Sequence, residues 1–325
     1  RKNITNLKKE ASDENQHYFH GLAWYARYIK AIENTTLWIK DLKKNNELTD
    51  YELEIAKVGL GEFCLQVLHG IPMSQSETIR PSEIKIDEEL LTEFSNISKN
   101  IIENSSSECK QNLCKMISKN TNNGIFPKIG LDETYEQIRN QFARFTDEKI
   151  LPNSHKWHLN DELIPMDIIE EMAELGVFGL TIPEEYGGLG LSKTAMCIVS
   201  EELSRGWIGT GSLGTRSEIA SELILIGGTE DQKKKFLAGI AKGKILPTAV
   251  FSEPDIGSDL AHLKTRAELV NDNYKIYGNK TWITHGSRAN LMTMLVRTDK
   301  NIKNHDGLSI LLAEKVEGSE KEPFP

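Results

Sequence analysis

Cysteine is scarce in this sequence of 325 residues, and long apolar runs are missing from it. The four cysteines are Cys64, Cys109, Cys114 and Cys197. They show neither Cys-x-x-Cys spacing nor histidines nearby in a metal-ligating pattern, so we interpret them as reduced thiols and expect a cytoplasmic protein without a metal site. No stretch approaches the roughly 18 apolar residues that a membrane-spanning helix needs, so no membrane span is expected.

An excess of positive charge is missing too. Lys and Arg total 39 against 48 Asp and Glu, a formal net charge of -9, which argues against nucleic acid as the main partner. With 38% hydrophobic and 27% charged residues, the composition is that of an ordinary globular protein, and the length suggests two or three domains. The sequence has no initiating Met, no signal-like segment and no closing element after its last apolar run, so we expect a fragment or trimmed ends.

The first 125 residues have the periodicity of a helical module. Apolar residues recur at helical spacing from His17, and Thr49 with Glu52 forms a capping-box pattern at the start of a second helix. We expect these two helices to form a hairpin, followed by helices near residues 88–103 and 110–119. The Asn- and Gly-rich segment 120–127 has the composition of a linker, so we place a domain boundary after residue 125.

Residues 126–245 are expected to form a second helical domain. The stretch 183–190 is a glycine-rich loop, but it has neither GxGxxG spacing nor a phosphate-loop lysine, so nucleotide binding by that route is not expected. A second capping-box pair, Thr229 and Gln232, begins the last helix of the domain. Helices are expected over 131–145, 165–176, 192–204, 216–225 and from 229 onward.

Beyond Lys244 the apolar period changes from that of helices to that of strands, so residues 246–325 are expected to form a β domain. The chain is therefore predicted to be α+β, with helices first and an antiparallel, barrel-like β domain after them. Strands are expected over residues 245–252, 265–270, 274–277, 280–283, 291–298 and 308–316.

Two stretches of the β domain have the composition of binding loops. In residues 249–260 an apolar run stops at Glu253-Pro254 and a Gly-Ser-Asp turn follows, which leaves backbone N–H groups and two serine hydroxyls available. Residues 278–286 repeat this order of turn, short strand with an aromatic residue, hydroxyl and glycine. Each stretch alone is typical of a hairpin, but the two together in this order indicate a site.

These stretches resemble signatures of the acyl-CoA dehydrogenase family. Residues 252–259 resemble its [TS]-E-P-x-x-G-S-D signature, and residues 278–284 resemble its G-x-K-x-[WFY]-I-[TS] signature. The loop from Pro183 resembles a Pro-Glu-x-Tyr-Gly-Gly segment of the family, and residues 228–234 resemble a Gly-[ST]-x-x-Gln-[KR] helix start. The four motifs stand in family order over about residues 131–316.

The resemblance implies that FAD binds with its flavin against the β domain. By motif position, the backbone at Ala249 and Phe251 and the backbone and hydroxyl of Ser252 would hydrogen-bond the pyrimidine side of the flavin. Ala249 stands where the family often has an aromatic residue, so only a backbone contact is expected there. Gly257 would permit close approach of the ligand, and Ser258 would contact the pantetheine or phosphate part of CoA.

The second signature implies contacts to the other side of the flavin. Trp282 would pack against the ring and Thr284 would reach its N5 edge, with Ile283 between them; the bare pattern also allows Trp282 to be a core residue of a hairpin. In the family the catalytic base is a glutamate of a C-terminal four-helix domain. That domain is absent from this sequence, so we assign no catalytic base and expect residues 1–325 alone to be catalytically incompetent.

The helical module in front, together with residues 211–218, resembles methylsuccinyl-CoA dehydrogenases of the ethylmalonyl-CoA pathway. This implies oxidation of 2-methylsuccinyl-CoA to mesaconyl-CoA, with electron-transfer flavoprotein as electron acceptor. A dicarboxylic acyl group favours a cation near the far end of its pocket, and Arg216 is the candidate partner of that ω-carboxylate. The alternative is a surface arginine that pairs with Glu218 or Glu222.

Other functions are compatible with the same motifs. An acyl-CoA oxidase or a nitroalkane-oxidase-like flavoenzyme would pass its electrons to oxygen instead. A non-catalytic binding or assembly protein of the same fold is also compatible, because the base is missing and the front module is additional. The expected partners are an acyl-CoA substrate, electron-transfer flavoprotein and further copies of the chain in a dimer or tetramer.

Overall fold

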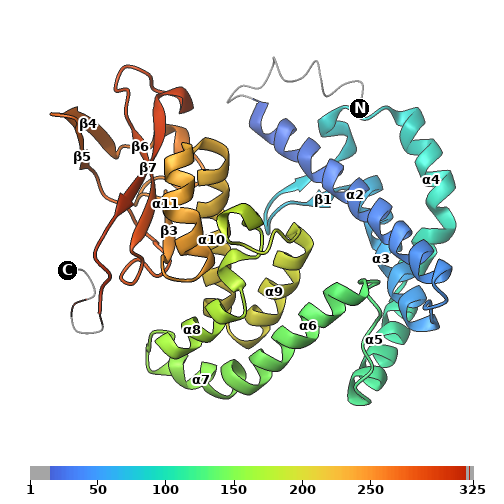
Figure 1. The fold of residues 1–325 in the computed structure, drawn as a ribbon. Coiled ribbons are helices and arrows are strands. Elements are labelled where there is room, and N and C mark those ends of the chain that lie inside the picture. Colours follow the sequence, from blue (N-terminus) through green and yellow to red (C-terminus); the bar gives the residue numbers. More distant parts are fainter. Residues whose placement is uncertain (1–14, 320–321, 323–325) are drawn as a thin grey trace. The chain divides into compact units, whose positions relative to one another are not determined.

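The computed structural model describes residues 15–319 and 322, and the chain divides into two compact units. The first unit ends at Leu131 and the second begins at Asp132. The boundary therefore lies six residues beyond the one expected from the linker composition. Figure 1 shows the helices and strands of both units as a ribbon.

The first unit is built on the helical hairpin of α2 and α3. The Thr49 hydroxyl and the Glu52 carboxylate form the predicted capping box at the start of α3. A short hairpin that the sequence did not indicate follows α3, and each of its two strands has two residues. Its Ile71 and Ile79 pack with Tyr25 in the core of this unit. The elements are α2 (Gln16–Lys44), α3 (Asp50–His69), β1 (Ile71–Pro72), β2 (Thr78–Ile79), η2 (Pro81–Ile84), α4 (Glu88–Ile102), η3 (Glu103–Ser105) and α5 (Ser107–Asn122).

The second unit begins with helices that form most of its core. The first predicted helix does not stop at Phe145 but continues through a π-helical turn into α7. The helix predicted over 216–225 starts earlier, at Ile208. The elements are α6 (Glu133–Phe145), η4 (Thr146–Ile150), α7 (Leu151–Leu159), α8 (Met166–Glu174), η5 (Val177–Gly179), η6 (Glu184–Tyr186), α9 (Lys193–Gly206), α10 (Ile208–Gly227) and α11 (Glu230–Ala241).

The early start of α10 has a packing reason. A side chain at Gly211 would place its Cβ 2.0 Å from the Ser204 hydroxyl, and one at Gly214 would lie 3.0 Å from Val177. Glycine lowers helix propensity, but at these positions it allows α10 to lie close to α9 and to η5.

A five-stranded mixed sheet forms the rest of the second unit, and β6 is its central strand. β3 pairs with the first half of β6 in parallel, β4 meets the end of β6 at Arg266 and Arg297, and β7 runs antiparallel along the other side. β4 and β5 form an antiparallel hairpin. The remaining elements are β3 (Pro247–Val250), η7 (Leu260–His262), β4 (Arg266–Val270), β5 (Asn273–Tyr277), β6 (Leu291–Arg297), η8 (His305–Gly307) and β7 (Leu308–Glu314).

Two expectations about this sheet were wrong. The sheet is mixed rather than antiparallel, because the forty residues between β3 and β6 are long enough for the crossover that parallel pairing requires. Residues 280–283 are not a strand, because Trp282 has a φ of 58°, a left-handed conformation that no regular strand contains. Helices α10 and α11 cover one face of the sheet, where Ile224 and Leu237 pack with Leu291 (Figure 1).

Candidate functional site

Residues 281–285 form a loop that lies along β3. The Thr248 hydroxyl donates a hydrogen bond to the Thr284 carbonyl at 2.8 Å, and His285 Nε2 donates to the Pro247 carbonyl at 3.1 Å. Both bonds tie the loop to the beginning of the strand. The second stretch that the sequence indicated is therefore held against the strand that leads into the first.

A second pair of contacts lies just beyond the end of β3. The Thr281 N–H donates to the Ser252 carbonyl at 3.0 Å, and the Lys280 ammonium donates to the Phe251 carbonyl at 2.8 Å. Both carbonyls of the segment expected to bind the flavin are thus held by the second signature segment.

Glu253 and Lys280 form a buried ion pair beneath this junction, with Oε1 and Nζ 3.1 Å apart. The two side chains are only 5% and 8% exposed. The same carboxylate accepts hydrogen bonds of 2.8 Å from the backbone N–H groups of Lys264 and Thr265. Burial alone would raise the pKa of Glu253, but the hydrogen bonds that stabilise its anion outweigh burial and lower the pKa to about 2.

The Trp282 side chain is not part of the protein core. It is 89% exposed, which contradicts the alternative that it is a buried hairpin residue. Its left-handed backbone, with φ of 58°, is uncommon for a bulky residue and is held by the contacts of its neighbours to β3. The loop therefore presents an uncovered aromatic ring beside the Phe251–Ser252 segment.

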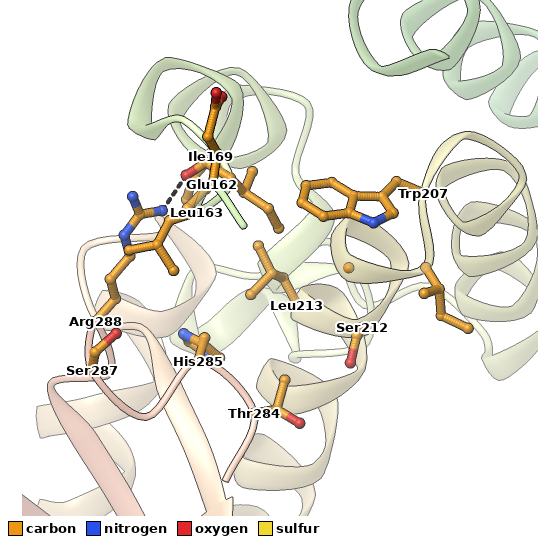
Figure 2. A pocket seen from close by; sticks show the side chains of 13 residues that line it. Glu162, Leu163, Ile169, Trp207, Ser212, Leu213, Thr284, His285, Ser287 and Arg288 are labelled. Atoms are coloured by element: carbon orange, nitrogen blue, oxygen red, sulfur yellow. Dashed lines mark hydrogen bonds between the residues drawn. The ribbon is translucent and has the colours of Figure 1, made fainter. Parts of the chain in front are cut away.

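A cavity of about 360 Å³ lies between the loop and the helices of the same unit (Figure 2). Its walls are mostly apolar, and Thr284, His285 and Arg288 supply polar groups from the loop side. The Arg288 guanidinium donates to the Ile164 carbonyl across the cavity rim, the dashed line in Figure 2. The lining residues are Glu162, Leu163, Ile164, Ile169, Trp207, Ile208, Gly209, Ser212, Leu213, Thr284, His285, Ser287 and Arg288.

His285 is a neutral imidazole in this cavity. Burial is the main reason that its pKa is lowered to about 4. The hydrogen bond to Pro247 raises the pKa by a smaller amount, and the positive charges of Arg216 and Arg288 add to the lowering. Its Nδ1 is buried and has no hydrogen-bond partner among the described residues. The site thus contains a hydrogen-bond acceptor, Nδ1 of His285, to which a ligand or a water molecule can donate.

Arg216 lies on α10, and its surroundings differ from those expected of a surface arginine that pairs with Glu218 or Glu222. Glu218 and Glu222 form ion pairs with Lys193, not with Arg216. The Nε of Arg216 is buried without a hydrogen-bond partner among the described residues. Arg216 does not line the 360 Å³ cavity, so its predicted contact with an acyl carboxylate is not part of that cavity wall.

The other predicted site residues lie at the junction or near it. Ala249 is the third residue of β3 and half-buried, and Ile283 is half-buried in the loop. Gly257 and Ser258 lie in an exposed turn, and a Cβ at Gly257 would meet nothing within 4 Å. The turn is therefore open, and the contacts of Gly257 and Ser258 with a ligand stay a prediction.

Several residues that line the cavity were not among the predicted site residues, among them Trp207, Ser212 and His285. His285 directly follows the second signature, which was a signal that could have identified it. Trp207 and Ser212 lie about 75 residues earlier, and no local pattern connects them to the loop.

Within residues 15–319 and 322, no group of His, Cys, Asp and Glu could hold a metal ion, and no helix is long and apolar enough to cross a membrane.

Family profiles match most of the second unit. The N-terminal domain of acyl-CoA dehydrogenases matches residues 132–244, and their middle domain matches residues 248–322. The chain belongs to the acyl-CoA dehydrogenase family. The members of this family are FAD-dependent oxidoreductases, and one related glutaryl-CoA dehydrogenase from Mycobacterium smegmatis was solved in complex with FADH2.

Individual acyl-CoA dehydrogenases show how much of the chain is related. (2S)-Methylsuccinyl-CoA dehydrogenase of Cereibacter sphaeroides is 48% identical over 98% of this chain and 58% of its own length. Mitochondrial isobutyryl-CoA dehydrogenase of Dictyostelium discoideum is 34% identical over 58% of this chain and 45% of its own. The chain thus spans about half the length of the curated relatives it matches, and the first of them also covers the helical module in front.

Solved acyl-CoA dehydrogenases have the same fold as part of the chain. The enzyme from Geobacillus kaustophilus is 31% identical, with a TM-score of 0.54 over 57% of this chain and 49% of its own. Glutaryl-CoA dehydrogenase in complex with glutaryl-CoA is 30% identical, with a TM-score of 0.54 over 57% of this chain and 48% of its own. The expectation of an acyl-CoA dehydrogenase-like fold is confirmed.

The residues at the junction fit the FAD of the family. Trp282 offers an exposed aromatic face, and the two signature segments supply the hydroxyls of Ser252 and Thr284. Trp282 and Thr284 belong to a loop that is hydrogen-bonded to Ser252 at its start and to β3 at its end, so the backbone of the loop is held before any ligand binds. A planar, hydrogen-bonding ring system is what such an arrangement can bind.

Proposed function

We propose that the protein oxidises the α,β-carbon bond of an acyl-CoA thioester with FAD, and that 2-methylsuccinyl-CoA, converted to mesaconyl-CoA, is its substrate. The observation that carries this proposal is the junction of the two signature segments, where an exposed Trp282 and the Ser252 segment are held side by side. The 48% identity to a (2S)-methylsuccinyl-CoA dehydrogenase over nearly the whole chain supports the substrate.

The chain's own residues have a positioning role in this chemistry. The reaction removes the α-proton and the β-hydride of the acyl group and leaves a carbon–carbon double bond. The bound flavin supplies the acceptor for the hydride. The Ser252 and Thr284 hydroxyls and the backbone of 249–252 would orient the ring, and Trp282 would stack against it. Gly257 and Ser258 would contact the CoA part of the substrate.

The α-proton needs a base that this chain's site does not provide. The nearest titratable group of the loop, His285, donates its Nε2–H to Pro247, and Glu253 is occupied by Lys280 and two backbone N–H groups. We propose that the base lies in a further part of the protein, since the relatives are longer than this chain. Electron-transfer flavoprotein is the proposed electron acceptor, and copies of the chain are the proposed oligomeric partners.

The test uses the full protein with bound FAD. We expect dye reduction, or reduction of electron-transfer flavoprotein, with 2-methylsuccinyl-CoA and formation of mesaconyl-CoA by mass spectrometry. Rapid electron transfer to oxygen instead would favour an acyl-CoA oxidase. Absence of both FAD binding and acyl-CoA oxidation would refute the proposal in favour of a binding or assembly protein.

Substrate choice is tested separately at Arg216. Its buried, unpaired Nε and the pairing of Glu218 and Glu222 with Lys193 support a role toward an anionic acyl group. We expect Arg216→Ala to reduce kcat/KM for 2-methylsuccinyl-CoA about 100-fold more than for butyryl-CoA, because a charge-assisted pair is lost only with the first. Arg266→Ala, which breaks an exposed pair with Glu268, is the matched control. Equal losses on both substrates would count against the role.

A further inference from the structure

The ion pair of Glu253 and Lys280 joins the two signature segments at their closest point. Glu253 belongs to the first segment and Lys280 to the second, and both side chains are almost fully buried. Burying two charges is costly, and a well-packed apolar pair is often at least as stabilising. The four hydrogen bonds made by this pair therefore suggest a role in geometry rather than in stability alone.

The Lys280 ammonium has a second contact that bears on the site. It donates to the Phe251 carbonyl at 2.8 Å as well as to Glu253. A trans peptide directs its N–H opposite to its C=O, and no cis peptide is found among the described residues. Holding the Phe251 carbonyl on the Lys280 side therefore turns the Ser252 N–H to the other side of the segment.

The neighbouring contacts extend this effect into the loop. Because Thr281 follows Lys280 directly, its N–H is brought to the Ser252 carbonyl at 3.0 Å. The next residue is Trp282, whose left-handed backbone requires fixed neighbours to be maintained. One buried ammonium thus determines both the orientation of the 251–252 peptide and the start of the loop that presents the indole.

We propose that Glu253 and Lys280 are positioning residues for the flavin: Glu253 fixes the Lys280 ammonium, and Lys280 orients the Phe251–Ser252 peptide and the 281–285 loop toward the ring. This inference rests on the proposed FAD-dependent function. The pair does not touch the reacting atoms. Its effect is expected in cofactor affinity and cofactor geometry, not in a proton-transfer step.

The experiment compares three variants of the full protein after removal of the flavin. Lys280→Met removes the ammonium and keeps an unbranched side chain that is one atom shorter. Lys280→Arg keeps the charge opposite Glu253 but replaces a single ammonium by a planar, branched group that cannot reproduce both contacts. Lys264→Met is the matched control, since Lys264 forms an exposed ion pair with Asp255 in the same loop region. FAD affinity is measured by fluorescence quenching, and visible circular dichroism at saturating FAD reports the geometry of the bound ring.

We expect Lys280→Met to weaken FAD binding about tenfold or more, the effect of losing a hydrogen bond to a charged group, and to change the visible circular dichroism. Lys280→Arg is expected to keep the melting temperature of the FAD-free protein close to wild type while still weakening FAD binding. It carries the test if Lys280→Met does not fold. Lys264→Met should match wild type in both measurements.

A purely stabilising role predicts a different result. Lys280→Arg would then restore FAD affinity together with folding, and Lys280→Met would lower the melting temperature but leave the dichroism of bound FAD unchanged. Either result overturns the positioning role. A wild-type protein that does not bind FAD would instead refute the proposed function, so the two failures are distinguishable.

Discussion

The cavity histidine makes the free energy of unfolding depend on pH, and His285→Gln is the perturbation that tests this. In the folded protein burial lowers the pKa of His285 to about 4, from 6.5 for a free imidazole. Between these two pH values the unfolded state binds the proton and the folded state does not. The contribution of the neutral His285 to the free energy of unfolding is therefore fully present above about pH 6.5 and is lost as the pH falls toward 4.

The magnitude follows from the shift. A difference of 2.5 pKa units corresponds to about 3 kcal/mol over the whole window, and about 2 kcal/mol of that is lost by pH 5. Glutamine cannot take up a proton, but its amide can still donate to the Pro247 carbonyl that His285 Nε2 contacts. The variant should therefore lose less stability on acidification than wild type, whatever its stability at pH 7.5.

The assay is urea unfolding of both proteins at pH 7.5, 6.5, 5.5 and 5.0, in the absence of FAD. The neighbouring Arg216 and Arg288 stay charged throughout this range, and the other titrating groups are common to both proteins, so the difference between the curves isolates His285. Replacement of the exposed His305 by Gln is the control and should leave the curve of wild type unchanged. Parallel curves for wild type and His285→Gln would refute the reasoning.

Three further changes test other features of the structure. Gly188→Ala places its Cβ 2.1 Å from the Ile182 carbonyl oxygen and is expected to destabilise the protein by about 3 kcal/mol in urea unfolding. Gly59→Ala in α3 is the contrast: its Cβ meets nothing within 4 Å, so it should stabilise the protein by roughly 0.5–1 kcal/mol. A change of the same sign in both variants would contradict the packing described. Glu202→Ala removes a buried carboxylate that pairs with two arginines and should lower the free energy of unfolding by about 3–5 kcal/mol, and a loss below 1 kcal/mol would show that the pair is solvated. Trp282→Ala should change the stability of the FAD-free protein by no more than about 0.5 kcal/mol but weaken FAD binding in a fluorescence titration, and unchanged FAD binding would remove the indole from the site.

Features with a local cause could be predicted from the sequence. The capping boxes at Thr49 and Thr229 were predicted from side chains three residues apart and are confirmed. The signature stretches likewise indicated that residues near Ser252 and Trp282 belong together. The capping boxes could be predicted because each pattern and its structural consequence lie within three residues. The two signature stretches are about 30 residues apart, and they were connected through their resemblance to the motifs of one family.

Features that depend on distant partners could not be predicted in this way. The aromatic and β-branched residues of 280–283 indicated a strand, but Trp282 has a left-handed backbone in a loop that is hydrogen-bonded to Ser252 and to β3. The helix expected over residues 216–225 begins at Ile208, because the glycines before residue 216 allow close contacts with α9 and η5. The parallel pairing of β3 and β6, and the cavity wall at Trp207, depend on the fold of the whole unit.

The central position of β6 also determines when the site can exist during synthesis. Among the described strands β3 pairs only with β6, so its partner is complete only once residues 291–294 have left the ribosome. The loop that carries Trp282 depends on β3 for part of its hydrogen bonding. Parallel pairing over such a sequence separation forms late, because the chain must first close a long loop. Cofactor loading therefore requires a chain extended past β6, and any shorter nascent chain exposes the signature residues without yet forming a site for the flavin.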